Sequence, residues 1–133
     1  MPGVKSRPSH SLVGRFRQCV DEHVPRIVKV GDYAKLLRIS RYRLNRKVNE
    51  QIGTTASRVI HDRLLLEAQR LLLHSESTVS EIAYSLHFVD PSYFGRFYRR
   101  RQGVTPAEYR RRARNHVAEL QAIDVADAFT AEI

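Results

Sequence analysis

The sequence predicts an all-α protein with seven helices, and three observations indicate this class. Glycine and proline are sparse, at 6 and 5 of 133 residues, which disfavours a turn-rich β architecture. Residues 55–74 hold apolar side chains at helical spacing over a length of about 30 Å. Helix-start signatures recur along the chain, among them the capping boxes Thr78-x-x-Glu81 and Thr105-x-x-Glu108 and the cap-proline pair Asp90-Pro91. No segment gives a convincing strand pattern.

Each predicted helix has its own periodicity or its own start and stop signals. Phe16 and Val20 belong to one apolar face of a first helix, which closes before Pro25. Ser40 and Gly53 are suited to cap the two ends of the third helix. The predicted helices cover residues 11–23, 31–37, 41–52, 55–74, 78–86 and 90–102, and a last helix opens at Thr105-Pro106.

These helices divide the chain into five predicted parts. The long helix is expected to link two smaller helical units, and residues 1–10 are expected to be a flexible lead-in. The parts are an N-terminal lead-in with the first helix (1–25), a first unit (26–54), the linker helix (55–75), a second unit with its final helix (76–116) and an acidic tail (117–133).

A weak internal repeat with a period near fifty residues relates the two units. Each unit consists of a short helix, a tight turn and a capped second helix, so each is predicted to be a helix-turn-helix subdomain. One residue is gained in the turn of the second copy. The matching residues are Ala34, Leu37 and Ile39 with Ala83, Leu86 and Phe88; Ser40, Leu44 and Arg46 with Asp90, Phe94 and Arg96; and Gly53 with Gly103.

The second helix of each unit is predicted to bury one side and to expose the other. Leu44, Val48 and Ile52 in one helix, and Phe94 and Tyr98 in the other, have the i, i+4 spacing of a buried stripe. The opposite sides carry residue types that bind base edges and phosphates in double-stranded DNA. Those side chains are Arg41, Tyr42, Asn45, Arg46 and Asn49 in the first unit, and Ser92, Gly95, Arg96 and Arg99 in the second.

The geometry of DNA agrees with this interpretation. An α-helix fits the major groove, and two such helices one turn of DNA apart would lie about 34 Å from each other. The linker helix, at roughly 30 Å, is suited to hold them at that separation.

Positive charge also favours a nucleic-acid partner and is unevenly distributed. The 23 lysines and arginines exceed the 14 acids, for a net charge of +9. Residues 92–114 contain eight arginines and one acid, whereas residues 117–133 contain four acids and no lysine or arginine. Arg99-Arg100-Arg101 lies beside the second exposed face and is expected to bind phosphate. Phosphate binding and simple solvation fit the next four arginines about equally: Arg110, Arg111, Arg112 and Arg114.

Other classes of function find no support in the sequence. The six histidines and the single Cys19 lack metal-ligand spacing, so no metal site is expected. There is no nucleophile elbow and no phosphate-binding glycine loop, so neither an enzyme nor a bound cofactor is expected. The chain has no long apolar run and no signal-peptide start. We therefore expect a cytoplasmic protein without a membrane partner.

A set of motifs supports a family resemblance. Glu81-Ile82-Ala83, Phe88-x-Asp90-x-Ser92-Tyr93-Phe94-x-Arg96 and Gly103-Val104-Thr105-Pro106-x-x-Tyr109-Arg110 occur together in the second half of the chain. Arg63-Leu64-x-x-x-Ala68 and Leu44-x-Arg46 add to them in the first half. On these residues the sequence resembles the AraC/XylS family of transcription regulators, over roughly residues 26–114.

This resemblance implies two helix-turn-helix units that enter adjacent major-groove segments on one face of the DNA. It also implies regulation of transcription, commonly activation through contact with RNA polymerase. A bacterial protein that is nucleoid-associated when bound to DNA is likewise what the resemblance implies. By position it assigns DNA contacts to Tyr42, Asn45 and Arg46, and to Ser92, Tyr93 and Arg96. Burial of Tyr93 remains an alternative. With the exposed Arg41, Arg99 and Arg100, these residues form the predicted DNA-contact set.

The chain departs from the family pattern at several places. His87 stands where the family usually has a glycine in the turn, a position at which histidine is costly if φ is positive. Gly95 lies inside the second recognition helix, at a cost of about 1 kcal/mol relative to alanine. Val48 and Asn49 replace an aromatic–lysine pair. Only about thirty residues precede the first unit, too few for the usual sensing domain, so we expect a sensorless regulator or a fragment of a longer chain.

Two hypotheses about function follow. In the first, the chain is a sequence-specific DNA-binding transcription regulator, with activation the expected sign. In the second, it is a truncated interaction module that pairs with a full-length regulator or binds DNA non-specifically. The acidic tail supports the second hypothesis, because it also carries apolar residues such as Leu120, Ile123 and Phe129 that suit a partner helix.

Overall fold

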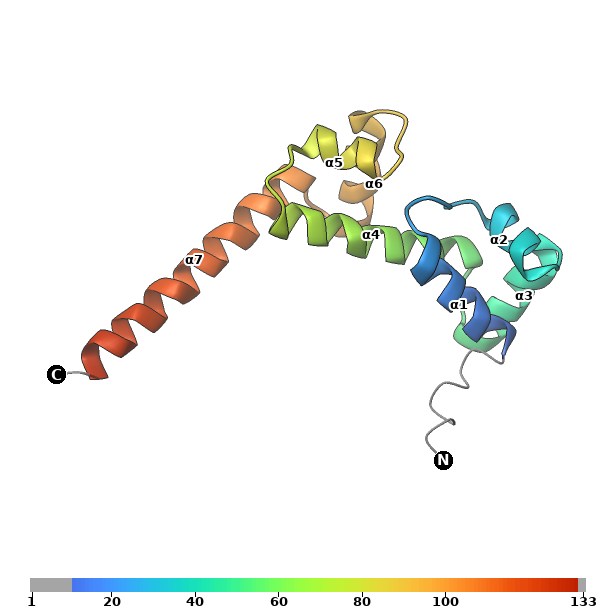
Figure 1. Ribbon diagram of the computed structural model, residues 1–133, viewed down its shortest axis with the longest axis horizontal. Coiled ribbons are helices and arrows are strands. Elements are labelled where there is room, and N and C mark those ends of the chain that lie inside the picture. The colour runs from blue at the N-terminus through green and yellow to red at the C-terminus, as the bar shows by residue number, and fades with distance from the viewer. Residues whose placement is uncertain (1–10, 132–133) are drawn as a thin grey trace. The chain divides into compact units, whose positions relative to one another are not determined.

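The computed structural model describes the backbone of residues 11–131 and the side chains of residues 11–123, and these form seven helices without a strand (Figure 1). The predicted all-α class is confirmed over this range. The predicted lead-in, residues 1–10, and the last two residues of the acidic tail lie outside it. The helices are α1 (Leu12–His23), α2 (Val30–Leu37), α3 (Arg41–Ile52), α4 (Ala56–His74), α5 (Val79–Ser85), α6 (Pro91–Gln102) and α7 (Pro106–Ala131).

The chain forms two compact units, and the division between them falls within α4. Unit 1 extends to Glu67 and contains α1, α2, α3 and the first part of α4. Unit 2 begins at Ala68 and contains the rest of α4 with α5, α6 and α7. The division therefore falls inside the helix that the sequence predicts as the linker, and each unit contains one of the two repeats.

Unit 1 has its core where α1, α2 and α3 pack together. Phe16, Tyr33 and Leu44 are fully buried there, one from each helix. The Phe16 and Tyr33 rings meet edge to face at 5.7 Å between centroids. The Tyr33 hydroxyl donates a hydrogen bond of 2.7 Å to the carbonyl oxygen of Ile27, which fixes the segment before α2. Burial raises the pKa of Tyr33 to about 12, so the hydroxyl stays a donor.

Unit 2 has an aromatic core. Phe94 and Tyr98 are fully buried on α6, and their rings lie 6.0 Å apart. Phe88 packs on Phe94 at 5.2 Å, and Tyr98 packs on Tyr109 of α7 at 5.9 Å. Each such pair adds about 0.5–1.5 kcal/mol beyond the burial of its area. The row of rings links the turn, α6 and α7, whereas the equivalent positions of α3 are the aliphatic Leu44 and Val48.

The turns of the two repeats begin in the same way, although the second is longer. After α2, Arg38 has φ 60°, and the N–H of Ile39 donates to the carbonyl of Ala34 at 3.0 Å. After α5, His87 has φ 69°, and the N–H of Phe88 donates to the carbonyl of Ala83 at 3.1 Å. Both are left-handed helix ends of the Schellman type, built on a residue other than glycine. His87 therefore does have a positive φ, the condition under which the sequence predicts that histidine is costly at this position.

The predicted caps at the start of the recognition helices are present. Ser40 Oγ accepts from the N–H of Arg43 at 3.1 Å, and Asp90 Oδ1 accepts from the N–H of Tyr93 at 3.1 Å. Gly53 and Gly103 end α3 and α6 in the left-handed conformation, with φ of 68° and 81°. Each repeat therefore begins and ends its second helix in the same way, despite little identity between them.

The capping boxes predicted for α5 and α7 are also present. The Thr78 side chain accepts from the N–H of Glu81, and Glu81 accepts in return from the N–H of Thr78 at 2.7 Å. Thr105 and Glu108 make the same reciprocal pair at 3.1 and 2.9 Å. Hydrogen bonds from Thr105 lower the pKa of Glu108.

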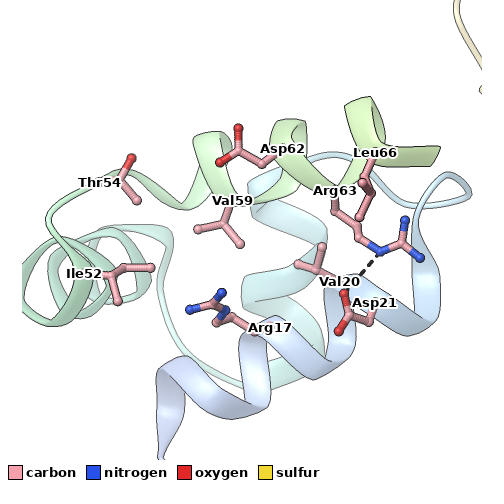
Figure 2. Close-up of a pocket in the computed structure, with 9 residues that line it drawn as sticks. All are labelled: Arg17, Val20, Asp21, Ile52, Thr54, Val59, Asp62, Arg63 and Leu66. Carbon is pink, nitrogen blue, oxygen red and sulfur yellow. Dashed lines mark hydrogen bonds and ion pairs between the residues drawn. The ribbon is translucent and has the colours of Figure 1, made fainter. Parts of the chain in front are cut away.

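The predicted burial of Ile52 is wrong. The side chain is 40% exposed, because Ile52 is the last residue of α3 and lies one turn beyond Val48, which is fully buried. Ile52 instead lines an open groove of unit 1 with a volume of about 320 Å³ (Figure 2). Across this groove lie Arg17 of α1 and Val59 of α4, and the groove is closed on one side by the ion pair of Arg63 with Asp21 at 3.2 Å.

The final helix is longer than the sequence indicates. α7 continues without a break from Pro106 to Ala131, through residue 117, where the acidic tail is predicted to begin. Val117, Leu120 and Ile123 on this extension are between 41% and 54% exposed. The first half of α7 packs into unit 2, and residues 115–123 are exposed.

The strained turn at His87 leads to a test of stability. Replacing His87 by glycine should raise the free energy of unfolding by about 1 kcal/mol, because glycine adopts a positive φ without the Cβ penalty. Urea unfolding followed by circular dichroism measures this. The control is His87→Ala, which removes the imidazole but keeps the Cβ and should give no gain. Equal stability of the glycine and alanine variants would show that the turn is not strained.

Candidate nucleic-acid interface

The predicted contact residues of unit 1 lie on the outward side of α3. Leu44 and Val48 are fully buried and fix the rotation of the helix. Arg41, Tyr42 and Arg46 are exposed as a result, Tyr42 to 73%.

Arg46 is held by an ion pair along the helix. Its Nε lies 3.2 Å from Glu50 Oε2, and Lys47 lies 3.7 Å from the other oxygen of the same carboxylate. Both side chains of the Arg46 pair are about half exposed or more, so the pair contributes little to stability. A phosphate or a guanine edge can therefore displace Glu50 at small cost.

Asn45 has a bond within the fold. Its Oδ1 accepts a hydrogen bond of 2.9 Å from the N–H of Ala56, which is the first residue of α4. Ala56 is fully buried, so this bond satisfies a backbone donor that water does not reach. A two-bond contact with adenine needs both amide atoms of asparagine. In this conformation the amide oxygen of Asn45 already accepts one hydrogen bond within the fold, which ties its orientation to the start of α4.

The predicted contact residues of unit 2 lie together on the outward side of α6. Because Phe94 and Tyr98 are buried, the opposite side of α6 faces outward. Tyr93 is 54% exposed, so the alternative of a buried Tyr93 is wrong, and its contact with DNA stays a prediction. The guanidinium of Arg96 lies 4.7 Å from the centre of the Tyr93 ring. The exposed residues of this face are Ser92, Tyr93, Arg96, Arg99 and Arg100.

An open hollow lies beside this face. It has a volume of about 430 Å³ and is formed by the turn before α6 and the helix itself. Tyr93, Arg96 and Arg100 line it from α6, and His87 and Val89 line it from the turn. Val89 is 83% exposed. The sequence did not predict this exposure, because it depends on the path of the turn.

Two of the four later arginines bind within the fold. The sequence suggested phosphate binding or simple solvation for all four, and Arg110 and Arg114 instead have a structural role. Arg110 donates from Nε to the carbonyl of Leu72 at 2.8 Å and from a terminal nitrogen to that of Ser75 at 3.2 Å. Arg114 donates to the same Ser75 carbonyl at 3.0 Å and pairs with Glu76. These bonds satisfy the carbonyl of Leu72, in the last turn of α4, and that of Ser75, which directly follows the helix. Arg111 and Arg112 remain exposed.

Among the described residues there is neither a candidate metal site nor a helix suited to span a membrane. Between residues 11 and 123 no three His, Cys, Asp or Glu side chains group in a way that could hold a metal ion. Within the same part of the chain, no helix combines the length and the apolar character needed to cross a membrane.

Comparison with known proteins identifies the family. A family model described as a helix-turn-helix domain matches residues 33–112, from α2 into α7, and so covers both repeats. The chain belongs to the AraC/XylS family. The resemblance seen in the sequence is thereby confirmed, as are the two helix-turn-helix subdomains of this family's DNA-binding domain.

Individual members of the AraC/XylS family match most of the chain. The HTH-type transcriptional activator RhaS of Escherichia coli O139:H28 (strain E24377A / ETEC) is 31% identical over 91 residues. These residues are 68% of this chain and 33% of RhaS, so the chain spans about a third of that regulator's length.

Two solved structures match the fold. The DNA-binding domain of AdpA, a global transcriptional factor solved in complex with a target DNA, is 27% identical with a TM-score of 0.69. The match covers 77% of this chain and 92% of that one. The C-terminal domain of AraT, a response regulator from Geobacillus stearothermophilus, is 26% identical with a TM-score of 0.68 and covers 73% and 81% of the two chains.

The bond between Asn45 and Ala56 can be tested through stability. Asn45→Ala removes the acceptor to which the buried N–H of Ala56 donates. The free energy of unfolding should fall by about 1–2 kcal/mol, the cost of losing a cap or of burying a donor without a partner. Asn49→Ala on the same helix is the matched control, since Asn49 is exposed, and it should leave stability within about 0.5 kcal/mol of the parent. If both variants unfold like the parent, the bond contributes nothing.

Proposed function

We propose that the chain is a sequence-specific regulator of transcription that binds double-stranded DNA with α3 and α6 in two adjacent segments of the major groove. One observation carries the proposal. Two helices that are capped at matching positions each bury an apolar side and expose a side with arginine at the same repeat position, Arg46 and Arg96. The α-helix is the element that fits the major groove, and arginine is the side chain that most often contacts guanine there.

The predicted contact residues divide into two roles in this proposal. Arg46 and Arg96 contact base edges, and Asn45 adds a single donor from its amide nitrogen. Arg41, Arg99 and Arg100 bind phosphates and supply affinity that does not depend on sequence. Tyr42, Ser92 and Tyr93 lie against the sugar-phosphate backbone, where hydroxyl groups are common donors.

We also propose that the chain activates transcription and contacts RNA polymerase while bound to DNA. Support comes from the relative RhaS, an HTH-type transcriptional activator that shares 31% of its residues over the matched region. The match lies within a third of RhaS, so activation is assigned here to the DNA-bound state of this domain and not to any sensing function.

A second candidate function has a specific observation in its favour. Val117, Leu120 and Ile123 expose apolar surface on the extension of α7, as expected for an interaction module that pairs with another regulator. In that case the basic face of α6 would bind DNA without sequence preference.

Selection of bound DNA from a random pool separates the two candidates. The proposal expects a motif of two boxes with centres about one helical turn apart, one for each recognition helix. Binding of the pool without enrichment of any motif would contradict specific regulation and favour the interaction module.

The proposed roles of the arginines on α6 predict different effects of two matched variants. Arg96→Ala should lose about 1–3 kcal/mol of discrimination at one base pair of the selected site, because the base contact is gone. Arg100→Ala, one turn further along the same helix, should weaken all DNA alike and reduce the salt slope of log K by about one unit.

Fluorescence anisotropy with selected and random duplexes at several salt concentrations measures both variants. An Arg96 variant that loses equal affinity for the two duplexes would show that Arg96 does not contact bases. An unchanged salt slope in the Arg100 variant would remove that residue from the phosphate contacts.

A further inference from the structure

Gly95 is a glycine in the interior of a recognition helix. It follows the fully buried Phe94 in α6, seven residues before the end of that helix. Glycine is the least favourable residue in a helix interior apart from proline, because it has the most backbone freedom to lose on folding. Its presence at this position therefore needs a physical reason.

The fold itself does not require a glycine at position 95. A Cβ built on Gly95 meets no other heavy atom within 4 Å, so an alanine would fit without displacing a neighbour. The backbone there is helical and lacks the positive φ of Gly53 and Gly103. Neither close packing nor backbone strain accounts for Gly95.

The internal repeat shows why this position has no structural task. Gly95 matches Asn45, and both precede the arginine of their helix. Asn45 accepts a hydrogen bond from the N–H of Ala56, the first residue of the next helix. The residue that matches Ala56 in the second repeat is Pro106, which has no N–H to donate. An acceptor is needed at position 45 and is not needed at position 95.

The neighbours of Gly95 are the predicted DNA-contact residues of unit 2. Ser92 and Arg99 lie one turn before and one turn after it on the helix surface, and Arg96 is adjacent. All three side chains are exposed. Gly95 thus leaves a strip of bare helix backbone between a hydroxyl and two guanidinium groups.

We propose that Gly95 is a DNA-contact residue, at which the absence of a side chain lets the backbone of α6 lie directly against base edges in the major groove. The inference rests on the proposed function, because it assumes that this face of α6 binds DNA. Any side chain at position 95 would then hold the helix away from the groove floor and lengthen the contacts of Ser92 and Arg96 as well.

The test is a series of side chains of increasing size, Gly95→Ala, Gly95→Ser and Gly95→Leu. Affinity for the duplex selected from the random pool is measured by anisotropy, and unfolding is followed in urea by circular dichroism. Gly95→Ala should unfold at a higher urea concentration than the parent. It should bind the selected duplex roughly tenfold more weakly, the scale of one lost base contact, and the leucine variant should bind more weakly still.

Gly103→Ala is the matched control at the end of the same helix. Its φ of 81° makes alanine unfavourable, so this variant should unfold at a lower urea concentration while affinity for the selected duplex stays within about twofold of the parent. A loss of affinity in the Gly95 series can then be separated from a change in stability.

Two results would overturn the inference. One is parental affinity in Gly95→Ala. The other is weaker binding combined with easier unfolding, which would show a structural role for the glycine. If the parent protein enriches no motif and binds no duplex, the proposed function itself fails. If the parent binds its selected duplex and the Gly95 variants bind it equally well, only the inference about Gly95 fails.

Discussion

The tight turn between the two helices of each repeat is the constraint on which the rest of the structure depends. In both turns a backbone N–H reaches back to the carbonyl of an alanine, Ala34 or Ala83, across a residue with positive φ. Those alanines are 2% and 0% exposed, and a larger side chain would keep the paired helices apart. With the turn fixed, the direction of the second helix is fixed, and its buried stripe decides which residues are exposed.

The two repeats share this frame but use it with different side chains. Unit 2 fills its core with a row of aromatic rings, which tie α6 to the turn on one side and to α7 on the other. Unit 1 has Leu44 and Val48 at the same places and uses the amide of Asn45 to hold α4. The matching position in unit 2 is Gly95, which has no side chain and makes no such bond. Position 45 therefore has a task within the fold that position 95 does not have.

The arginine-rich segment shows why charge alone does not define a binding surface. Of the eight arginines between residues 92 and 114, Arg110 and Arg114 are bound to carbonyls at the end of α4. Arg96, Arg99 and Arg100 lie on the outward side of α6. The positive charge that favours DNA is therefore carried by fewer side chains than the composition suggests, and those on α6 are gathered on one helix.

The sequence by itself determined the helices, their caps and the repeat, because these depend on interactions within about four residues of the chain. Capping by Ser40, Asp90 and Thr105 and the apolar spacing of α6 are of this kind, and the helix starts agree with the prediction to within about one residue. Only the tertiary structure decided the partners of Asn45, Arg110 and Arg114, which lie 11 to 39 residues away. It also decided the exposure of Ile52, since burial at a helix end depends on whether another helix reaches that far. Local pattern shows which side chains can face outward, and packing between distant segments shows which of them are already bound.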